Sequence, residues 1–203
     1  LVFELTKAID LNLSYDELHQ LTKEIRERLI DITNTVGGHL ASNLGVVEIT
    51  LALHTIFNSP TDKFLWDTSH QTYVHKMLTG RLNQMYTIKQ YKGLSGFAKI
   101  SESDHDTFGA GHASTSLSAA IGLAQARNAR QENHSVVCVL GDGGLSGGMA
   151  YEALNNIKEL KGNFICILND NDMSISPPVG AMANYITNIR TTKVYDEMKD
   201  KFQ

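Results

Sequence analysis

Two short apolar runs constrain the fold of this chain more than any other feature of its sequence. The first covers residues 136–140 (Val-Val-Cys-Val-Leu) and the second covers residues 164–168 (Phe-Ile-Cys-Ile-Leu). Both are rich in β-branched residues and too short for a helix, which is typical of strands buried on both faces of a parallel sheet. Between them, residues 147–160 carry apolar side chains at helical spacing. The order of strand, helix and strand predicts a βαβ unit.

Small and polar residues follow each run. Gly-Asp-Gly-Gly occupies residues 141–144, and Asn-Asp-Asn occupies residues 169–171. Open α/β sheets bind ligands beyond the carboxyl ends of neighbouring parallel strands, so Asp142 and Asn171 are expected to lie close together. Their oxygen atoms suit Mg²⁺, which also accepts phosphate oxygens, and glycines let the backbone approach such a ligand. A lone Gly-Asp-Gly is more often an ordinary turn, but the pair indicates a diphosphate held through a divalent ion.

The sequence of residues 141–155 and 167–176 resembles that of 1-deoxy-D-xylulose-5-phosphate synthases, which are thiamine-diphosphate enzymes of the transketolase-like superfamily. The resemblance implies an α/β fold with three layers (α/β/α) and a mainly parallel sheet, the diphosphate-binding domain of such enzymes. It implies that Mg²⁺ is bound by Asp142, Asn171 and Met173, the last through its backbone carbonyl. It also places Gly143, Gly144 and Asn171 against thiamine diphosphate.

Two histidines match other motifs of the same family. His39 lies in a loop of small and polar residues, 38–45, and His70 follows a short strand predicted for residues 63–67. From the residues alone, His39 is as readily a loop histidine satisfied by backbone groups. The resemblance directs both histidines toward the reacting carbon as catalytic residues and also assigns His70 to the cofactor site. A zinc site formed by His70 and His75 is rejected, because a spacing of five residues does not put two ligands on one helix face.

A glycine-rich turn at residues 108–116 precedes a helix predicted for residues 117–129, with Ser114 as its cap. Such a turn is a nest of backbone N–H groups that faces an anion, although the pattern alone is weak. The resemblance assigns Gly111, His112 and Ala113 of this turn to cofactor binding.

Several further expectations concern the fold. A capping box at residues 14–17 predicts the start of an amphipathic helix that ends near Gly37, and a second helix is predicted for residues 46–57. Residues 82–99 are expected to be irregular surface structure, and residues 101–106 a solvated acidic loop. Because they lie inside predicted core strands, both cysteines are expected to be buried free thiols; they are Cys138 and Cys166.

Composition excludes several classes of protein. The 203 residues suit one large domain, and a net charge of −4 argues against nucleic acid as a partner. No apolar run reaches transmembrane length, so no membrane partner is expected, and no signal peptide is visible. The resemblance implies the cytoplasm of a bacterium, or a plastid in a eukaryote.

Members of the family condense pyruvate with D-glyceraldehyde 3-phosphate, with loss of CO2, using thiamine diphosphate and Mg²⁺. The resemblance therefore implies a homodimeric transferase that supplies isoprenoid, thiamine and pyridoxal biosynthesis. Family members continue into a pyrimidine-binding domain and a C-terminal domain, so residues 1–203 are expected to be a single N-terminal diphosphate-binding domain that is inactive alone. Two alternatives stay open: the N-terminal subunit of a split transketolase, and a non-catalytic interaction module.

Overall fold

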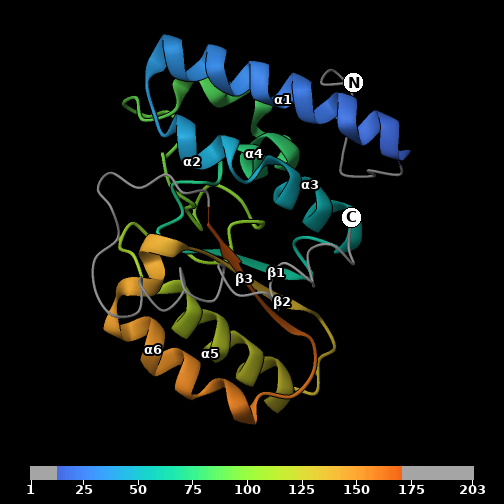
Figure 1. Cartoon of the computed structure of the whole chain (residues 1–203), viewed down its shortest axis with the longest axis vertical. Helices are drawn as coiled ribbons and strands as arrows, with labels where there is room; N and C mark the ends of the chain where they lie inside the picture. Colours follow the sequence, from blue (N-terminus) through green and yellow to red (C-terminus); the bar gives the residue numbers. More distant parts are fainter. Residues whose placement is uncertain (1–12, 171–203) are drawn as a thin grey trace, which may run out of the picture.

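A parallel sheet between two layers of helices forms the centre of the computed structural model, which describes residues 13–170 (Figure 1). Within this part of the chain, β1 (Lys63–Trp66), β2 (Val136–Gly141) and β3 (Phe164–Asn169) form the sheet in the order β1-β2-β3, and both pairs are parallel. The predicted α/β fold with a parallel sheet and a βαβ unit is confirmed.

The helices fall into two groups. One group comes before residue 90 and covers one face of the sheet, whereas α5 and α6 cover the other face (Figure 1). The helical segments are α1 (Tyr15–Val36), α2 (Leu40–Leu44), α3 (Val47–Ile56), α4 (Tyr73–Lys76), the π-helical turn η2 (Met77–Arg81), α5 (Ser116–Ala129), α6 (Gly148–Asn155), and the 3₁₀ segments η3 (Leu82–Thr87), η4 (Asp142–Ser146) and η5 (Ile157–Glu159).

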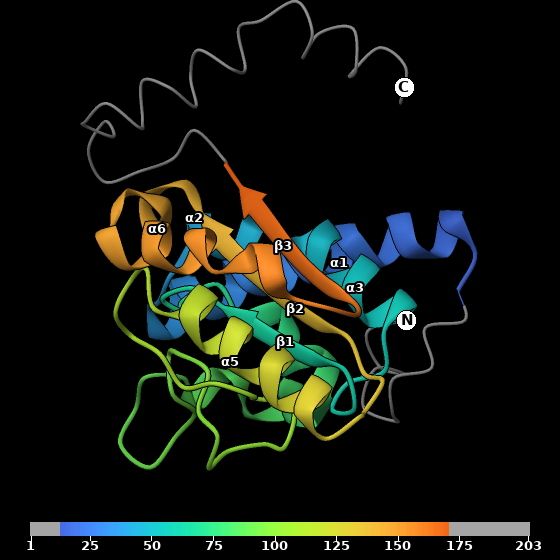
Figure 2. The same cartoon turned by 90° about the horizontal axis from the view of Figure 1, so that it is seen from below.

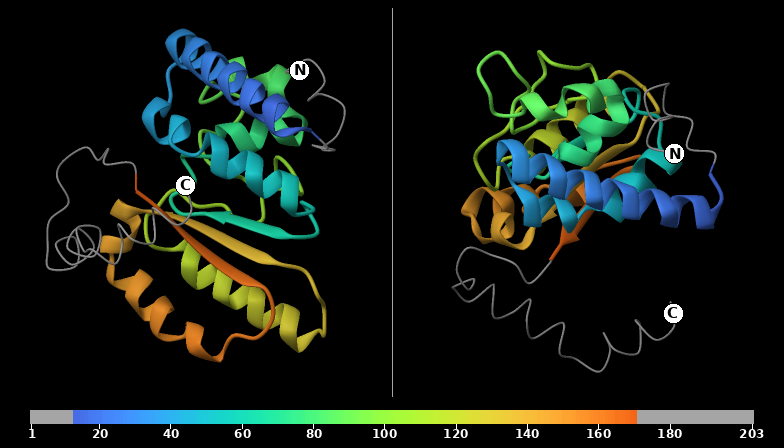
Figure 3. Two further views of the ribbon diagram at one scale, coloured as in Figure 1. Left: turned by 45° about the vertical axis from the view of Figure 1, so that its right-hand side comes forward. Right: turned by 90° about the horizontal axis from the view of Figure 1, so that it is seen from above.

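Side chains of β1 and β2 alternate between two cores. Phe64 and Val137 point toward α3, and Leu65 and Cys138 point toward α5. This alternation follows from the two-residue period of a strand, and helices on both sides explain why the whole of β2 is apolar. Figure 2, which views the molecule from below, shows α5 in front of β1, and Figure 3 shows α1 on the far side of α3 from the sheet.

β3 departs from the expectation of burial on both faces. Ile165 and Leu168 are 38% and 42% exposed, and Cys166 is exposed, whereas Cys138 is buried. Only Phe164 and Ile167 pack against the two cores. In the part of the chain that the structure describes, β3 pairs with β2 alone and is an edge strand, so its apolar residues have fewer neighbours than those of β2.

The first helix begins and ends as the sequence predicts. The Ser14 hydroxyl accepts a hydrogen bond from the backbone N–H of Glu17, and the Glu17 carboxylate accepts one of 2.8 Å from the N–H of Ser14. Gly37, with φ of 77°, ends the helix. The expected loop at 38–45 is partly wrong, since it contains the short helix α2.

Residues 88–106 are irregular and carry exposed side chains such as Tyr91 and Ile100, as expected, but the segment 82–106 is also partly buried, which its composition did not indicate. Leu82, Met85 and Leu94 belong to the core that α1 covers, and Asp106 is only 2% exposed. Apolar residues fold this segment against α1, and buried cations pair with its acidic residues, as described below. No helix among residues 13–170 combines the length and apolar character needed to span a membrane.

Candidate active site at the carboxyl edge of the sheet

The carboxyl ends of β2 and β3 lie side by side. Gly141 is in register with Asn169, so Asp142 begins at the sheet edge at which β3 also ends. The proximity of Asp142 to Asn171 stays a prediction, because Asn171 and Met173 lie outside the described residues. The Asp142 carboxylate is half-buried, and no described residue forms a hydrogen bond or ion pair with it. This oxygen donor is available for a cation.

Asp67, at the end of β1, joins this edge to the turn before α5. Its buried carboxylate accepts hydrogen bonds from the backbone N–H groups of Ser114 (2.8 Å) and Ser116 (3.2 Å). The prediction of an anion nest at this turn therefore needs correction, because two of its N–H groups already bind the protein's own carboxylate. Ser114 is also not the helix cap: its hydroxyl donates a 2.6 Å hydrogen bond to the carbonyl oxygen of Gly144.

These contacts join Gly144 to the turn that carries Gly111. Gly144 is buried against Asp67, and a Cβ atom added at Gly144 would lie 2.2 Å from the Asp67 carboxylate. Gly143 is exposed, as are Gly111 and His112, whereas Ala113 is half-buried. The His112 ring lies 2.7 Å from the Ala113 carbonyl oxygen. Both segments thus present backbone to solvent on either side of the Ser114–Gly144 bond.

His39 and His70 form a second part of the site. Their rings meet edge to face with centroids 5.3 Å apart, although the two residues belong to different elements. Asn43 holds them in place, because its buried side-chain amide donates to the carbonyl oxygens of His39 (2.6 Å) and His70 (2.9 Å). Its side-chain oxygen accepts a 2.8 Å hydrogen bond from the N–H of Tyr73. Sequence reasoning missed Asn43; its position four residues after His39, in a loop expected to be polar, gave no signal.

Tyr73 fixes the backbone of His39. Its hydroxyl lies 3.3 Å from the backbone nitrogen of His39 and 3.3 Å from the ring Nδ1. This approach requires Gly38, which has φ of +138° and whose Cβ, if present, would lie 2.7 Å from the hydroxyl oxygen. The glycine before the histidine therefore has a steric reason in this fold.

Burial favours the neutral form of both histidines. Burial, with a smaller contribution from the charge of Lys89, lowers the pKa of the His39 imidazole below its usual range. Burial and the neighbouring His39 also lower the pKa of His70, and Asp67 partly opposes that shift. The Nδ1 atom of His70 is buried and has no hydrogen-bond partner among residues 13–170. Neutral imidazoles of this kind can accept or donate a proton during a reaction.

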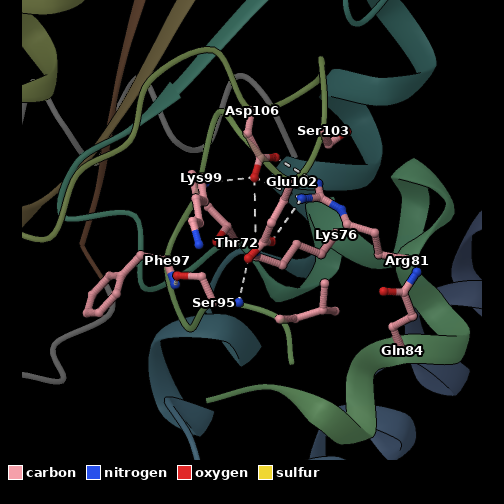
Figure 4. A network of polar contacts seen from close by, with 12 residues as sticks. Thr72, Lys76, Arg81, Gln84, Ser95, Phe97, Lys99, Glu102, Ser103 and Asp106 are labelled. Atoms are coloured by element: carbon pink, nitrogen blue, oxygen red, sulfur yellow. Dashed lines mark hydrogen bonds and ion pairs between the residues drawn. The ribbon is translucent and has the colours of Figure 1, made fainter. Parts of the chain in front are cut away.

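A buried ionic cluster is formed by Lys76, Arg81 and Asp106 together with Glu102, whose side chain is 14% exposed (Figure 4). Lys76 Nζ lies 2.5 Å from the Glu102 carboxylate, and two nitrogens of the Arg81 guanidinium lie 2.7 and 2.8 Å from the Asp106 carboxylate. Burial raises the pKa of Asp106, but the hydrogen bonds from His75 and Arg81 outweigh this effect and hold it below its usual range.

The two carboxylates of this cluster also bind the backbone of the loop at residues 95–106. Glu102 accepts a 2.6 Å hydrogen bond from the N–H of Ser95, and Asp106 accepts one of 2.8 Å from the N–H of Lys99. The loop carries Phe97, whose ring lies 5.6 Å from that of His39. The acidic loop expected to be solvated is therefore an internal support of the site.

His75 links the ionic cluster to a second buried histidine, His54. Its Nδ1 lies 2.9 Å from Nε2 of His54, and its Nε2 lies 3.3 Å from the Asp106 carboxylate. Burial lowers the pKa of His54 to about 2. No group of three potential metal-binding side chains occurs within residues 13–170.

A parallel sheet between two helical layers, with glycine turns after β2 and before α5, fits an α/β fold of the thiamine-diphosphate-binding type. The family model described as 1-deoxy-D-xylulose-5-phosphate synthase matches residues 4–203. The chain belongs to the 1-deoxy-D-xylulose-5-phosphate synthase family.

Curated relatives bear the same family name. The chain is 57% identical over 188 residues to a 1-deoxy-D-xylulose-5-phosphate synthase of Alkaliphilus oremlandii, a match that covers 93% of this chain and 30% of the relative. Proteins of that name from Desulfitobacterium hafniense and Brevibacillus brevis are 54% and 57% identical, over 94% and 92% of this chain and 30% of each relative. The chain thus spans 30% of the length of these relatives.

Proposed function

We propose that this chain is the diphosphate-binding part of a thiamine-diphosphate-dependent transferase that condenses pyruvate with D-glyceraldehyde 3-phosphate, with loss of CO2. The single observation that carries the proposal is the junction of two glycine-bearing segments through Ser114 and Gly144, beside the strand that leads to His70. The family name and its place in isoprenoid biosynthesis agree with this proposal.

The described residues fit a bound diphosphate and cation. Asp142 offers a carboxylate without a protein partner among them, and Gly143 exposes backbone beside it. In this proposal Asp142, Asn171 and the Met173 carbonyl hold Mg²⁺, which prefers such oxygen donors. The thiamine-diphosphate-binding residues are those named from the family: His70, Gly111, His112, Ala113, Gly143, Gly144 and Asn171.

The bound cofactor supplies an electron sink for decarboxylation. The part of this chain is to bind, orient and exchange protons. His39 and His70 lie together at one wall of the site, with neutral imidazoles that can stabilise an oxyanion or move a proton. Asn43 and Tyr73 hold the backbone of this pair, so the imidazoles are oriented before substrate arrives.

The remaining length of the relatives supplies the other half of the proposed site. We assign to it the binding of the aminopyrimidine end of the cofactor and of the substrate phosphate, and we expect the active form to be a homodimer. Residues 1–203 alone are then expected to give no turnover.

The test uses a completed enzyme, which is this chain joined to the remaining sequence of the Alkaliphilus oremlandii relative. With thiamine diphosphate and Mg²⁺, it is expected to consume pyruvate and D-glyceraldehyde 3-phosphate and release CO2. Two-carbon transfer from a ketose phosphate, without pyruvate consumption, would instead indicate the transketolase alternative. Failure to bind the cofactor at all would support the non-catalytic interaction module.

A further inference from the structure

Asp67 occupies an unusual position between the two glycine-bearing segments. It follows β1, its side chain is buried, and its own N–H donates a 2.8 Å hydrogen bond to the Val139 carbonyl oxygen of β2. The residue is therefore fixed to the sheet on its backbone side, while its carboxylate extends toward the turn before α5.

The two carboxylate oxygens of Asp67 accept different hydrogen bonds. Oδ2 accepts the hydrogen bond from the N–H of Ser114, and Oδ1 accepts the one from the N–H of Ser116. Buried carboxylates are stable only when hydrogen bonds replace water, and these two bonds come from the positive end of a 14-residue helix. The carboxylate thus positions the start of α5, and with it residues 111–113.

The same carboxylate also packs against the second glycine-bearing segment, residues 142–144. Gly144 lies so close to Asp67 Oδ2 that no side chain fits between them, and the Gly144 carbonyl oxygen accepts the hydrogen bond from the Ser114 hydroxyl. Gly147 is close to the same hydroxyl, since a Cβ there would lie 2.1 Å from its oxygen. Asp67, Ser114 and Gly144 therefore form one contact that joins three elements.

We infer that Asp67 is a positioning residue for cofactor binding: it sets the distance between the turn at 111–113 and the turn at 142–144 without touching the cofactor itself. This inference rests on the proposed function, because it takes those turns as the two sides of the diphosphate site. An aspartate is required because a carboxylate can accept from both backbone N–H groups, whereas an amide offers one oxygen and a donor that faces the other N–H.

Asp62 provides a matched control at the opposite end of the same strand. Its carboxylate also accepts two backbone hydrogen bonds, from the N–H groups of Ser135 (2.6 Å) and Asn58 (2.7 Å), but at the amino end of β1. Asp62→Asn and Asp67→Asn therefore make the same chemical change: each replaces a carboxylate that accepts two backbone hydrogen bonds with an amide. Only Asp67→Asn is expected to alter the cofactor site.

The first readout needs no cofactor and uses backbone amide hydrogen exchange in the completed enzyme. Asp67→Asn is expected to speed exchange at Ser114 and Ser116 about tenfold, the loss of a hydrogen bond to a charged group, while Asp62→Asn leaves both unchanged. Unchanged exchange at Ser114 and Ser116 in Asp67→Asn would overturn the inference.

The second readout is the dissociation constant of thiamine diphosphate in excess Mg²⁺. Asp67→Asn is expected to raise it about tenfold or more, Ser114→Ala is expected to raise it by a smaller factor, and Asp62→Asn is expected to change it by less than about twofold. If Asp67→Asn does not fold, Ser114→Ala decides, and its failure to weaken binding would overturn the inference. If the unmodified enzyme binds no cofactor, the proposed function fails, and the exchange readout alone then decides whether Asp67 positions the turns.

Discussion

The side-chain amide of Asn43 donates a 2.9 Å hydrogen bond to the carbonyl oxygen of His70, a residue that lies beyond α3 and β1 in the chain. The same amide binds the carbonyl oxygen of His39, so one buried side chain fixes both histidines. The hydrogen bonds of the Asn43 side chain are all to backbone groups. They position the backbones of His39 and His70 without occupying either imidazole ring.

Removal of Asn43 is expected to reduce both stability and turnover. Asn43→Ala leaves two half-buried carbonyl groups and the buried N–H of Tyr73 without their partner, which should lower the free energy of unfolding by about 2 kcal/mol. In the completed enzyme, kcat is expected to fall more than the affinity for thiamine diphosphate, since His39 moves relative to His70. Denaturant unfolding and steady-state kinetics measure the two effects. Asn34→Ala, at an exposed position of α1, is the control: it should leave kcat unchanged and raise the free energy of unfolding by at most about 0.5 kcal/mol through helix propensity.

Glycine substitutions test the contact between Gly38 and Tyr73. Gly38→Ala combines a strained φ with a collision at the Tyr73 hydroxyl, so we expect a loss of about 2 kcal/mol in unfolding free energy. Gly122→Ala, in open space on α5, should instead add about 0.5–1 kcal/mol. Thermal or urea unfolding distinguishes the two. Equal effects of the two variants would contradict the packing described for Gly38.

The buried ionic cluster is expected to be far more sensitive than a surface ion pair. Asp106→Asn removes the carboxylate that binds the Arg81 guanidinium through two nitrogens and leaves that buried cation only the Glu102 carboxylate at 3.6 Å, which should destabilise the fold by about 3 kcal/mol. The exposed pair between Arg130 and Glu132 spans 3.9 Å, so Glu132→Gln should cost less than about 1 kcal/mol. Urea unfolding at pH 7 measures both. A small effect of Asp106→Asn would show that the loop at 95–106 does not depend on this cluster.

Stability should fall as the pH is lowered from 7 to 5. Burial lowers the pKa of His54 to about 2 and also lowers that of His75, so the unfolded chain binds protons below about pH 6.5 that the folded chain does not. A histidine whose pKa is lowered as far as that of His54 reduces the free energy of unfolding by up to about 1.4 kcal/mol per pH unit once the pH is below about 6.5. His54→Gln is expected to remove one proton from that dependence. An unchanged slope in His54→Gln would contradict the burial of a neutral imidazole.

The sequence predicts the parallel sheet well because the physics of that feature is local. The apolar runs of β1 and β2 and the capping box at Ser14 depend on neighbours within a few residues. The partial burial of residues 82–106 depends instead on Lys76 and Arg81. In the sequence, these two residues cannot be distinguished from solvated cations of a helix.

The residues of the candidate site also differ in how far the sequence predicts them. Its glycines and histidines can be named from motifs, but their supports cannot. In the sequence, Asp67 is only the last residue before a loop. The structure shows that its carboxylate accepts hydrogen bonds from the N–H groups expected to face an anion. Asn43 likewise acts through contacts to Tyr73 and His70 that no spacing in the sequence predicts.

Calorimetric titration of thiamine diphosphate into the completed enzyme, with and without Mg²⁺, tests the central proposal most directly. The unmodified enzyme is expected to bind the cofactor in the presence of Mg²⁺ and to lose most of that affinity without it. Asp142→Ala should abolish the Mg²⁺-dependent binding, because the carboxylate that we assign to the ion is gone. Equal affinity of Asp142→Ala and the unmodified enzyme, in the presence of Mg²⁺, would contradict the proposal.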